Sequence, residues 1–240
     1  MQENKFLIPL AVVVAGALVA GAVMFRDKTP KTATPTEDPV VVEPVTASDR
    51  IIGNPNAPII VVEYSDTECP FCKTFQQTMH RIMDTYGPLG QVAWVYRHAP
   101  IVQLHPKAFK EAEAVECAGE QGGNTMFWKY LDKVYEITPS NNDLDPAELP
   151  KIAQEFGLNM ATFNTCLESG KYTEKVQKSV DAAIKATNGK LGTPFSVILS
   201  PDGTALPIRG AESFDVMKQT IQTLLLSVGT STQATTTPAN

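Results

Sequence analysis

Histidine, cysteine and clustered basic residues are scarce in this sequence. Its 240 residues include three histidines and four cysteines, and the net charge is −6. Because lysine and arginine form no basic block, the chain lacks the electrostatic footprint of a nucleic-acid-binding protein. A structural zinc site takes four ligands, usually two cysteine pairs or one pair with histidines. Two of the cysteines stand alone and no histidine lies at ligand spacing, so we expect neither a metal nor a cofactor.

The other two cysteines, Cys69 and Cys72, form a Cys-Pro-Phe-Cys motif between two structural signals. The run from Ala57 to Val62 is apolar and rich in β-branched residues, which is typical of a buried strand. Behind Cys69, apolar residues recur in steps of three and four, which indicates an amphipathic helix. They are Phe71, Phe75, Met79, Ile82, Met83 and Tyr86. Cys69 is therefore expected at the N-cap of that helix, with Pro70 at its first position.

The N-cap position predicts redox chemistry. The first turn of a helix presents unpaired N–H groups and a partial positive charge, and cysteines there have pKa values lowered to roughly 3.5–7.5. We therefore expect Cys69 to be an exposed nucleophile and Cys72, one turn further on, to be a buried resolving thiol. Such a dithiol supports thiol–disulfide exchange. The alternative is half of a zinc site, which the missing ligands disfavour.

Glu63 stands inside the apolar strand, six residues before Cys69. Burial of a carboxylate is costly, so its pKa should rise. One interpretation is that Glu63 accepts the proton of buried Cys72 during exchange, because perturbed acids cluster at active sites. The other interpretation is that the Glu63 side chain reaches solvent at the edge of the strand.

Thr193 and Pro194 precede a predicted strand over residues 195–199. Proline is tolerated at the first residue of a strand, so Pro194 need only mark where the strand begins. In the functional interpretation, this loop holds an extended substrate segment beside Cys69 through the backbone groups of Thr193. We also expect Pro70 and Phe71, between the two cysteines, to contact substrate.

The N-terminal residues predict attachment to a membrane. Residues 6–25 carry no charge and are long enough to cross a bilayer as a helix, so we expect residues 1–28 to be an uncleaved anchor. A cleaved signal peptide is the alternative, because small residues at 20–22 offer a cleavage site. Residues 29–48, rich in proline and threonine, should form an extended linker, and residues 229–240 a disordered tail. A dithiol that works by staying oxidised belongs outside the cytoplasm.

Residues 49–228 predict a single α/β domain. The strand, the active-site helix and a second strand over 91–97 form a parallel unit. Helices fill an insert over about 104–189, with glycines at 119, 122 and 123 expected to separate a helix over 107–118 from one over 126–135. After the insert we expect two more strands, over 195–199 and 205–209, and then a closing helix from about Ser213.

Several short motifs follow one another as they do in DsbA-like thioredoxin-fold proteins, and the chain resembles the membrane-anchored branch of that family. They are Gly53-Asn-Pro-Asn-Ala-Pro, Val62-Glu-Tyr-Ser-Asp, Glu68-Cys-Pro-Phe-Cys, Trp94-Val-Tyr-Arg-His-Ala-Pro, Leu104-His-Pro, Glu116-Cys and Gly192-Thr-Pro. The resemblance implies a thioredoxin fold with a helical insertion between its βαβ and ββα halves. It also implies dithiol–disulfide exchange on extracytoplasmic proteins, an acid at the position of Glu63, and a cis peptide before Pro194.

Phe71 departs from the family pattern. The best-known member has histidine at this position, next to the second cysteine, and Phe71 cannot donate a hydrogen bond to the thiolate. The resemblance therefore does not extend to a strongly oxidising potential.

The two isolated cysteines, Cys117 and Cys166, both fall in predicted helices of the insert. We expect them to form a structural disulfide, because an extracytoplasmic setting favours pairing. The alternative is two buried free thiols that behave as small hydrophobic side chains.

Together these features predict a membrane-anchored thiol–disulfide oxidoreductase in the periplasm or at the outer face of the cell membrane. Its substrates would be cysteine-containing extracytoplasmic proteins, and disulfide formation is the favoured direction. A reductase or isomerase is the alternative, because the sequence does not set the reduction potential. A less favoured alternative is a non-redox, membrane-tethered binding module. A DsbB-like or VKOR-like membrane redox partner fits the favoured interpretation, whereas a nucleic-acid partner does not.

Overall fold

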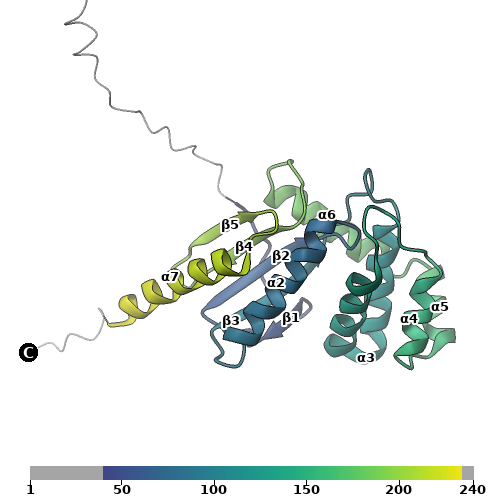
Figure 1. The fold of residues 1–240 in the computed structure, drawn as a ribbon, viewed down its shortest axis with the longest axis horizontal. Coiled ribbons are helices and arrows are strands. Elements are labelled where there is room, and N and C mark those ends of the chain that lie inside the picture. The colour runs from purple at the N-terminus through teal and green to yellow at the C-terminus, as the bar shows by residue number, and fades with distance from the viewer. Residues whose placement is uncertain (1–39, 234–240) are drawn as a thin grey trace, which may run out of the picture. The chain divides into compact units, whose positions relative to one another are not determined.

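The computed structural model describes residues 40–233, which are built around a five-stranded mixed sheet in the order β1-β3-β2-β4-β5 (Figure 1). The central strand β2 runs parallel to β3 and antiparallel to β4. The edge strands β1 and β5 are antiparallel to their neighbours. The strands span Arg50–Gly53 (β1), Ile59–Ser65 (β2), Val92–His98 (β3), Phe195–Leu199 (β4) and Ala205–Arg209 (β5).

The predicted strand–helix–strand unit is present around the Cys-Pro-Phe-Cys motif. β2 leads into α2 (Pro70–Tyr86), and β3 then pairs in parallel with β2 along its whole length. The apolar face of α2, including Phe75 and Met79, is fully buried. The carboxyl end of a central strand therefore delivers the chain directly to Cys69.

A helical insert separates β3 from β4, as predicted. Its helices are α3 (Ala108–Ile137), α4 (Glu148–Glu155), α5 (Met160–Glu168) and α6 (Thr173–Ala186). The prediction of two helices, over 107–118 and 126–135, is confirmed in outline: Gly122 and Gly123 have non-helical backbone angles and divide α3 by a kink, although the first helix continues past Gly119. Gly119 stays helical, since it serves close packing: a Cβ there would lie 3.1 Å from the Cβ of Phe127.

The N-terminal part of the described chain holds two features that the sequence did not predict. β1 adds a short antiparallel edge strand to β3. Residues 40–48, expected to belong to an extended linker, instead lie against the domain. Val40, Val42 and Val45 pack on a hydrophobic cluster, and Arg97 donates to the carbonyl oxygen of Glu43 at 3.0 Å. The predicted membrane helix over 6–25 lies outside the described residues, and within residues 40–233 no helix is long and apolar enough to span a membrane.

The closing helix α7 (Phe214–Gln233) continues past Gly229, where the tail was expected to begin. A glycine inside a helix costs only about 1 kcal/mol relative to alanine, and no proline follows within α7 to end it. The helix begins where the sequence predicted, and Ser213 caps its start by accepting a hydrogen bond from the backbone N–H of Val216 at 3.3 Å.

Two hydrophobic clusters cover opposite faces of the sheet, because successive strand residues point to alternate sides. The larger cluster includes Val61 and Trp94 and packs beneath α2, α3 and α7. The smaller one includes Val62 and Val95 and packs against α6. Glu63 and Ser65 alternate with Val62, so both point into the α2 side of the sheet, where the cysteines lie.

Candidate active site

Cys69 and Cys72 are unbonded thiols at the start of α2. Cys69 is the N-cap, with extended backbone angles, and Pro70 is the first helical residue, both as predicted. The sulfur of Cys69 donates a hydrogen bond to the carbonyl oxygen of Thr193 at 3.3 Å. Cys69 is 6% exposed and Cys72 is fully buried, so the nucleophile is more covered than expected but remains the accessible member of the pair.

The two thiols differ in acidity because of their surroundings. The pKa of Cys69 is lowered to about 6, first by a hydrogen bond from Cys72 and then by the backbone N–H groups of Cys72 and Phe71, against the effect of burial. The pKa of Cys72 is raised well above its usual range, mainly by burial and then by the neighbouring Cys69 sulfur. Cys69 is therefore the stable thiolate near neutral pH, and Cys72 holds its proton.

The loop before β4 lies against this sulfur. The peptide bond between Thr193 and Pro194 is cis, as the family resemblance implied. Pro194 is buried and Thr193 is half-buried, and the carbonyl of Pro194 accepts the N–H of Gly210 at 2.9 Å. Two segments far apart in sequence, 69–72 and 193–194, thus meet at one point, and the substrate-holding role of the 193–194 loop stays a prediction.

Glu63 is fully buried on β2, which excludes the alternative of a side chain at the strand edge. One carboxylate oxygen accepts the indole N–H of Trp94 at 2.8 Å, and the other has no hydrogen-bond partner within residues 40–233. Burial raises the pKa of Glu63 to about 7, although the polar side chains of Ser65 and Trp94 oppose the change. Glu63 can therefore gain or lose a proton at neutral pH, and its role in proton transfer stays a prediction.

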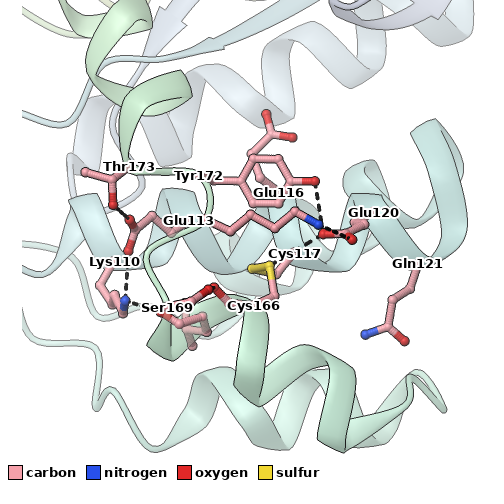
Figure 2. Close-up of a disulfide and its surroundings, with 12 residues drawn as sticks. Lys110, Glu113, Glu116, Cys117, Glu120, Gln121, Cys166, Ser169, Tyr172 and Thr173 are labelled. Atoms are coloured by element: carbon pink, nitrogen blue, oxygen red, sulfur yellow. Dashed lines mark hydrogen bonds and ion pairs between the residues drawn. A yellow bond between two sulfur atoms is a disulfide. The ribbon is translucent and has the colours of Figure 1, made fainter.

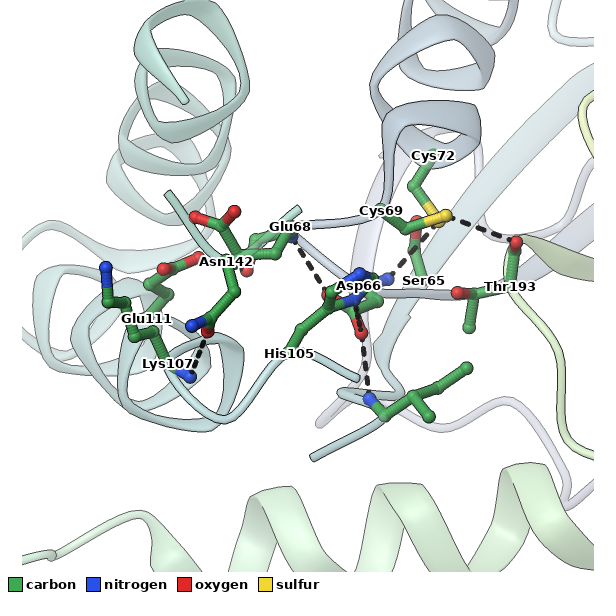
Figure 3. A network of polar contacts seen from close by, with 12 residues as sticks. Ser65, Asp66, Glu68, Cys69, Cys72, His105, Lys107, Glu111, Asn142 and Thr193 are labelled. Atoms are coloured by element: carbon green, nitrogen blue, oxygen red, sulfur yellow. Dashed lines mark hydrogen bonds and ion pairs between the residues drawn. The ribbon is translucent and has the colours of Figure 1, made fainter. Parts of the chain in front are cut away.

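Asp66 organises a network that the sequence did not reveal (Figure 3). Its backbone N–H donates to the sulfur of Cys72 at 3.4 Å. Its carboxylate accepts the N–H of Glu68 at 2.9 Å and that of Ile101 at 2.8 Å, and lies 2.9 Å from Nδ1 of His105. The signal that could have found the network is a polar run directly after a buried strand.

Glu68, the residue before Cys69, ties the active-site turn to the helical insert. Its carboxylate accepts the hydroxyl of Thr138 at 3.0 Å and the backbone N–H groups of Asp143 and Leu144 at 3.0 and 3.1 Å. Beside it, the hydroxyl of Thr67 donates to Glu111 at 2.6 Å.

Burial and the nearby charge of Glu68 raise the pKa of Glu111 to about 8. Glu111 is therefore mainly neutral at pH 7, which reduces the repulsion between its carboxyl group and that of Glu68. The turn that carries Cys69 is therefore bonded to the 138–144 loop through Glu68 and to α3 through Glu111.

Phe71 provides an apolar surface next to the nucleophile. Its side chain is 64% exposed although it lies in the first turn of α2, and Pro70 beside it is half-exposed. Leu104 is equally exposed, on the loop that Asp66 holds through the N–H of Ile101. An exposed apolar side chain of this size beside a reactive thiol, as Phe71 is, suits contact with another polypeptide.

Cys117 and Cys166 are joined in a disulfide between α3 and α5 (Figure 2). The sulfur atoms lie 2.03 Å apart and the Cα atoms 5.9 Å apart. Nearby, Glu120 of α3 accepts the hydroxyl of Tyr172 at 3.2 Å. The bond and these contacts fasten α5 and the start of α6 to α3. Within residues 40–233, no group of histidine, cysteine and acidic side chains is arranged to hold a metal ion.

Comparison with known proteins places this geometry in a family. A family model described as Thioredoxin matches residues 46–203. The chain belongs to this thioredoxin family. The crystal structure of DsbA2 from Pseudomonas aeruginosa is 27% identical with a TM-score of 0.59, and the match covers 77% of this chain and 94% of that one. Oxidised BdbD from Bacillus subtilis has the same fold, with a TM-score of 0.65 and 24% identity over 79% of this chain and 99% of that one. The predicted DsbA-like thioredoxin fold with a helical insertion is therefore confirmed.

The thioredoxin domain also matches part of a group of much longer proteins. The Na(+)/H(+) antiporter NhaA 3 from Salinispora tropica is 33% identical over 135 residues, which is 56% of this chain. The chain spans about a fifth of that antiporter's length, since the match covers 19% of it. Only one segment of the antiporter is thus similar to this domain. The antiporter's name describes the whole of that longer protein.

Proposed function

We propose that this protein forms disulfide bonds in extracytoplasmic substrate proteins through the Cys69–Cys72 dithiol. One observation carries the proposal: the two sulfurs are adjacent, yet Cys69 favours the thiolate and Cys72 favours the thiol. This asymmetry suits an exchange enzyme, because one sulfur must attack or leave readily while the other resolves the intermediate.

The reaction proceeds through a mixed disulfide. In the oxidised protein, a substrate thiolate attacks Sγ of Cys69, the bond to Cys72 breaks, and Cys72 departs with the electron pair. A second substrate thiolate then attacks the substrate sulfur that is bonded to Cys69. The sulfur of Cys69 leaves as a thiolate. The substrate loses two electrons and gains a disulfide, and the dithiol is reduced. The carbonyl of Thr193 beside Cys69 suits pairing with an extended substrate backbone.

Stabilisation of the Cys69 thiolate favours disulfide formation over reduction. A dithiol whose reduced form is stabilised gives up its disulfide more readily and is therefore more oxidising. Donors around Cys69, including the backbone N–H of Phe71, supply that stabilisation, whereas the exposed side chain of Phe71 adds none. A moderately oxidising protein fits these contacts better than a reductase.

We place the thioredoxin domain outside the cytoplasm, anchored by the uncharged residues 6–25. The Cys117–Cys166 disulfide supports an oxidising compartment. Turnover then requires reoxidation of Cys69 and Cys72, for which a DsbB-like or VKOR-like membrane partner is the proposed oxidant. In intact cells, a membrane-impermeant maleimide should label reduced Cys69; labelling only after lysis would contradict this location.

The proposed activity is tested with a reduced, unfolded protein that regains its function only after its disulfides form. The wild-type chain in a glutathione buffer should accelerate recovery, and Cys69→Ser should abolish the acceleration. A Cys117→Ala/Cys166→Ala variant is the matched control, because it also removes cysteines but leaves the dithiol intact. Full activity of Cys69→Ser would instead favour a non-redox binding module.

A further inference from the structure

The Cys72 sulfur accepts a hydrogen bond from the backbone N–H of Asp66 at 3.4 Å (Figure 3). Both residues are buried, since Cys72 is fully covered and Asp66 is 1% exposed. During exchange this sulfur parts from Cys69 and keeps the electron pair, so negative charge develops on it away from solvent. A donor already aimed at such an atom is most effective in a dry site, because nothing has to rearrange when the charge appears.

The peptide unit that carries this N–H is fixed at its other end. Its carbonyl group, that of Ser65, accepts the backbone N–H of Ala99 at 2.7 Å, just past the last paired residues of β2 and β3. A hydrogen bond to the carbonyl polarises the N–H of the same peptide and strengthens it as a donor. The carbonyl of Asp66 in turn accepts the N–H of Cys69 at 3.1 Å. The N–H therefore cannot turn away from Cys72 unless these contacts break.

The Asp66 carboxylate holds the same turn from the side-chain end. Oδ1 accepts the N–H of Glu68 at 2.9 Å, while Oδ2 accepts the N–H of Ile101 at 2.8 Å and lies 2.9 Å from Nδ1 of His105. A turn that only connects a strand to a helix needs the first contact, which is the usual Asx turn. The other two contacts reach residues 35 and 39 positions away, so the carboxylate also ties this turn to the 101–105 loop.

We propose that the Asp66 N–H is a catalytic donor that stabilises the Cys72 thiolate as it leaves and as it attacks, and that the Asp66 carboxylate and His105 are positioning groups that hold the donor on the sulfur. This inference rests on the proposed function and adds a catalytic group to it. The start of α2 stabilises charge on Cys69, and the Asp66 peptide does the same for the second sulfur.

The assisted step transfers no proton. A substrate thiolate forms a bond to Sγ of Cys69, the Cys69–Cys72 bond breaks, and its electron pair stays on Cys72. The Asp66 nitrogen keeps its proton throughout, and the Cys72 thiolate takes up a proton in a later step. In reverse, the Cys72 thiolate attacks Cys69 of the mixed disulfide and releases the substrate thiolate. Cys72 is uncharged in the disulfide and as a thiol, so the donor lowers the barrier in both directions and leaves the equilibrium nearly unchanged.

Other ionisable groups also surround the Cys72 sulfur. They are Glu63 on β2, Cys69 on α2, Tyr96 on β3 and Tyr135 on α3. Burial raises the pKa values of both tyrosines well above the usual range, so neither ionises near neutral pH. Of the hydrogen bonds within residues 40–233, the one that ends on the Cys72 sulfur comes from Asp66.

The test compares Asp66→Glu with wild type. Glutamate keeps the negative charge but is one methylene longer, so the three donors and the turn cannot keep their places. Reduced glutathione is mixed with oxidised protein, and the mixed disulfide at Cys69 is measured after acid quench. The isolated mixed disulfide reports the reverse step, in which Cys72 expels glutathione. Asp66→Glu should slow both steps by about 10-fold or more, as expected for a weakened charge-stabilising donor. The equilibrium constant should change by less than about 3-fold.

This split separates catalysis from a merely structural role, because a general disturbance of the dithiol would move the equilibrium as well as the rates. His105→Ala should slow both steps less, and adding it to Asp66→Glu should cost little more, because both act through one donor. Asp84→Glu is the matched control, since Asp84 is exposed two residues before the end of α2.

Three results would count against the account. Wild-type rates in Asp66→Glu, or an equilibrium constant that changes as much as the rates, would overturn the proposed donor. A loss of rate in Asp66→Asn but not in Asp66→Glu would also overturn it, because charge rather than position would then matter. If wild-type protein fails to exchange with glutathione at all, the proposed function itself fails.

Nuclear magnetic resonance covers the case in which Asp66→Glu does not fold. In Cys69→Ala, Cys72 is the remaining free thiol, and its ionisation should move the Asp66 amide proton downfield with the midpoint of the thiolate absorbance. The amide protons of Glu68 and Ile101, which donate to the carboxylate, should move less. An Asp66 amide proton that moves no more than these two would overturn the proposal.

Discussion

At the scale of single residues, the surroundings of two neighbouring sulfurs decide which one reacts. Donors at the start of α2 lower the pKa of Cys69 to about 6, whereas burial raises that of Cys72. In reduced protein, the alkylation rate of Cys69 should follow a titration near pH 6, well below the roughly 8.5 of a free thiol. Cys72→Ser should trap mixed disulfides through Cys69. Faster labelling of Cys72, or an unperturbed titration, would contradict this assignment.

Glu63 makes a second prediction at this scale, on stability as well as rate. Its pKa is about 7 in the folded protein against 4.5 in the reference state, so ionisation destabilises the fold as pH rises through 7. Below pH 4.5 the carboxyl is neutral in both states and costs nothing. Relative to wild type, Glu63→Gln should therefore gain stability from pH 4.5 to above 7, by up to about 3 kcal/mol.

Denaturant unfolding at pH 4 and pH 8 measures that gain, and the same variant should slow the exchange step in which Cys72 gains or loses its proton. A stability difference that is equal at both pH values would show that Glu63 does not titrate as described. Glu155→Gln is a suitable control, since this carboxyl group is 54% exposed on α4.

The chemical roles of these residues could be predicted from the local sequence, but the contacts around them could not. Cys69, Cys72 and Glu63 could be predicted because a strand, a helix start and an apolar run are each visible within a few residues. The contacts of Asp66 with His105, and of Glu68 with the 138–144 loop, join residues 35 or more positions apart. No local pattern encodes such pairings, because they depend on how the helical insert folds back.

At the scale of elements, the order of strands and helices followed from periodicity, whereas their exact ends depended on packing. The glycines of α3 illustrate the difference: Gly123 has a positive φ and marks the kink, but Gly119 fits against Phe127 and leaves the helix intact. β1 has four residues and pairs only with β3, so it leaves little signal in the sequence.

The Cys117–Cys166 disulfide makes a prediction about the elements it joins. It closes a loop with a sequence separation of 49 residues, for which chain entropy suggests roughly 4 kcal/mol of stabilisation. Replacing both cysteines with alanine should lower the melting temperature and loosen α5 on α3, while exchange at Cys69 stays nearly unchanged. Calorimetry and the exchange assay measure the two effects. An unchanged melting temperature would mean that the bond is not structural.

At the scale of the whole molecule, the fold brings a dithiol, a cis-proline loop and a helical insert together at the end of a central strand. The thioredoxin fold was predictable because its motifs occur in order along the chain. Membrane attachment and compartment depend on residues before Val40, and these stay predictions. The reduction potential depends on all the contacts to Cys69 at once, so no single motif sets it.

The reduction potential of the Cys69–Cys72 pair, measured against glutathione, tests the central claim most directly. Stabilisation of the Cys69 thiolate by the α2 N-terminus predicts a potential more oxidising than about −200 mV, on the side of disulfide-forming proteins. A more reducing value, toward the roughly −270 mV of thioredoxin, would contradict the account and identify the protein as a reductase.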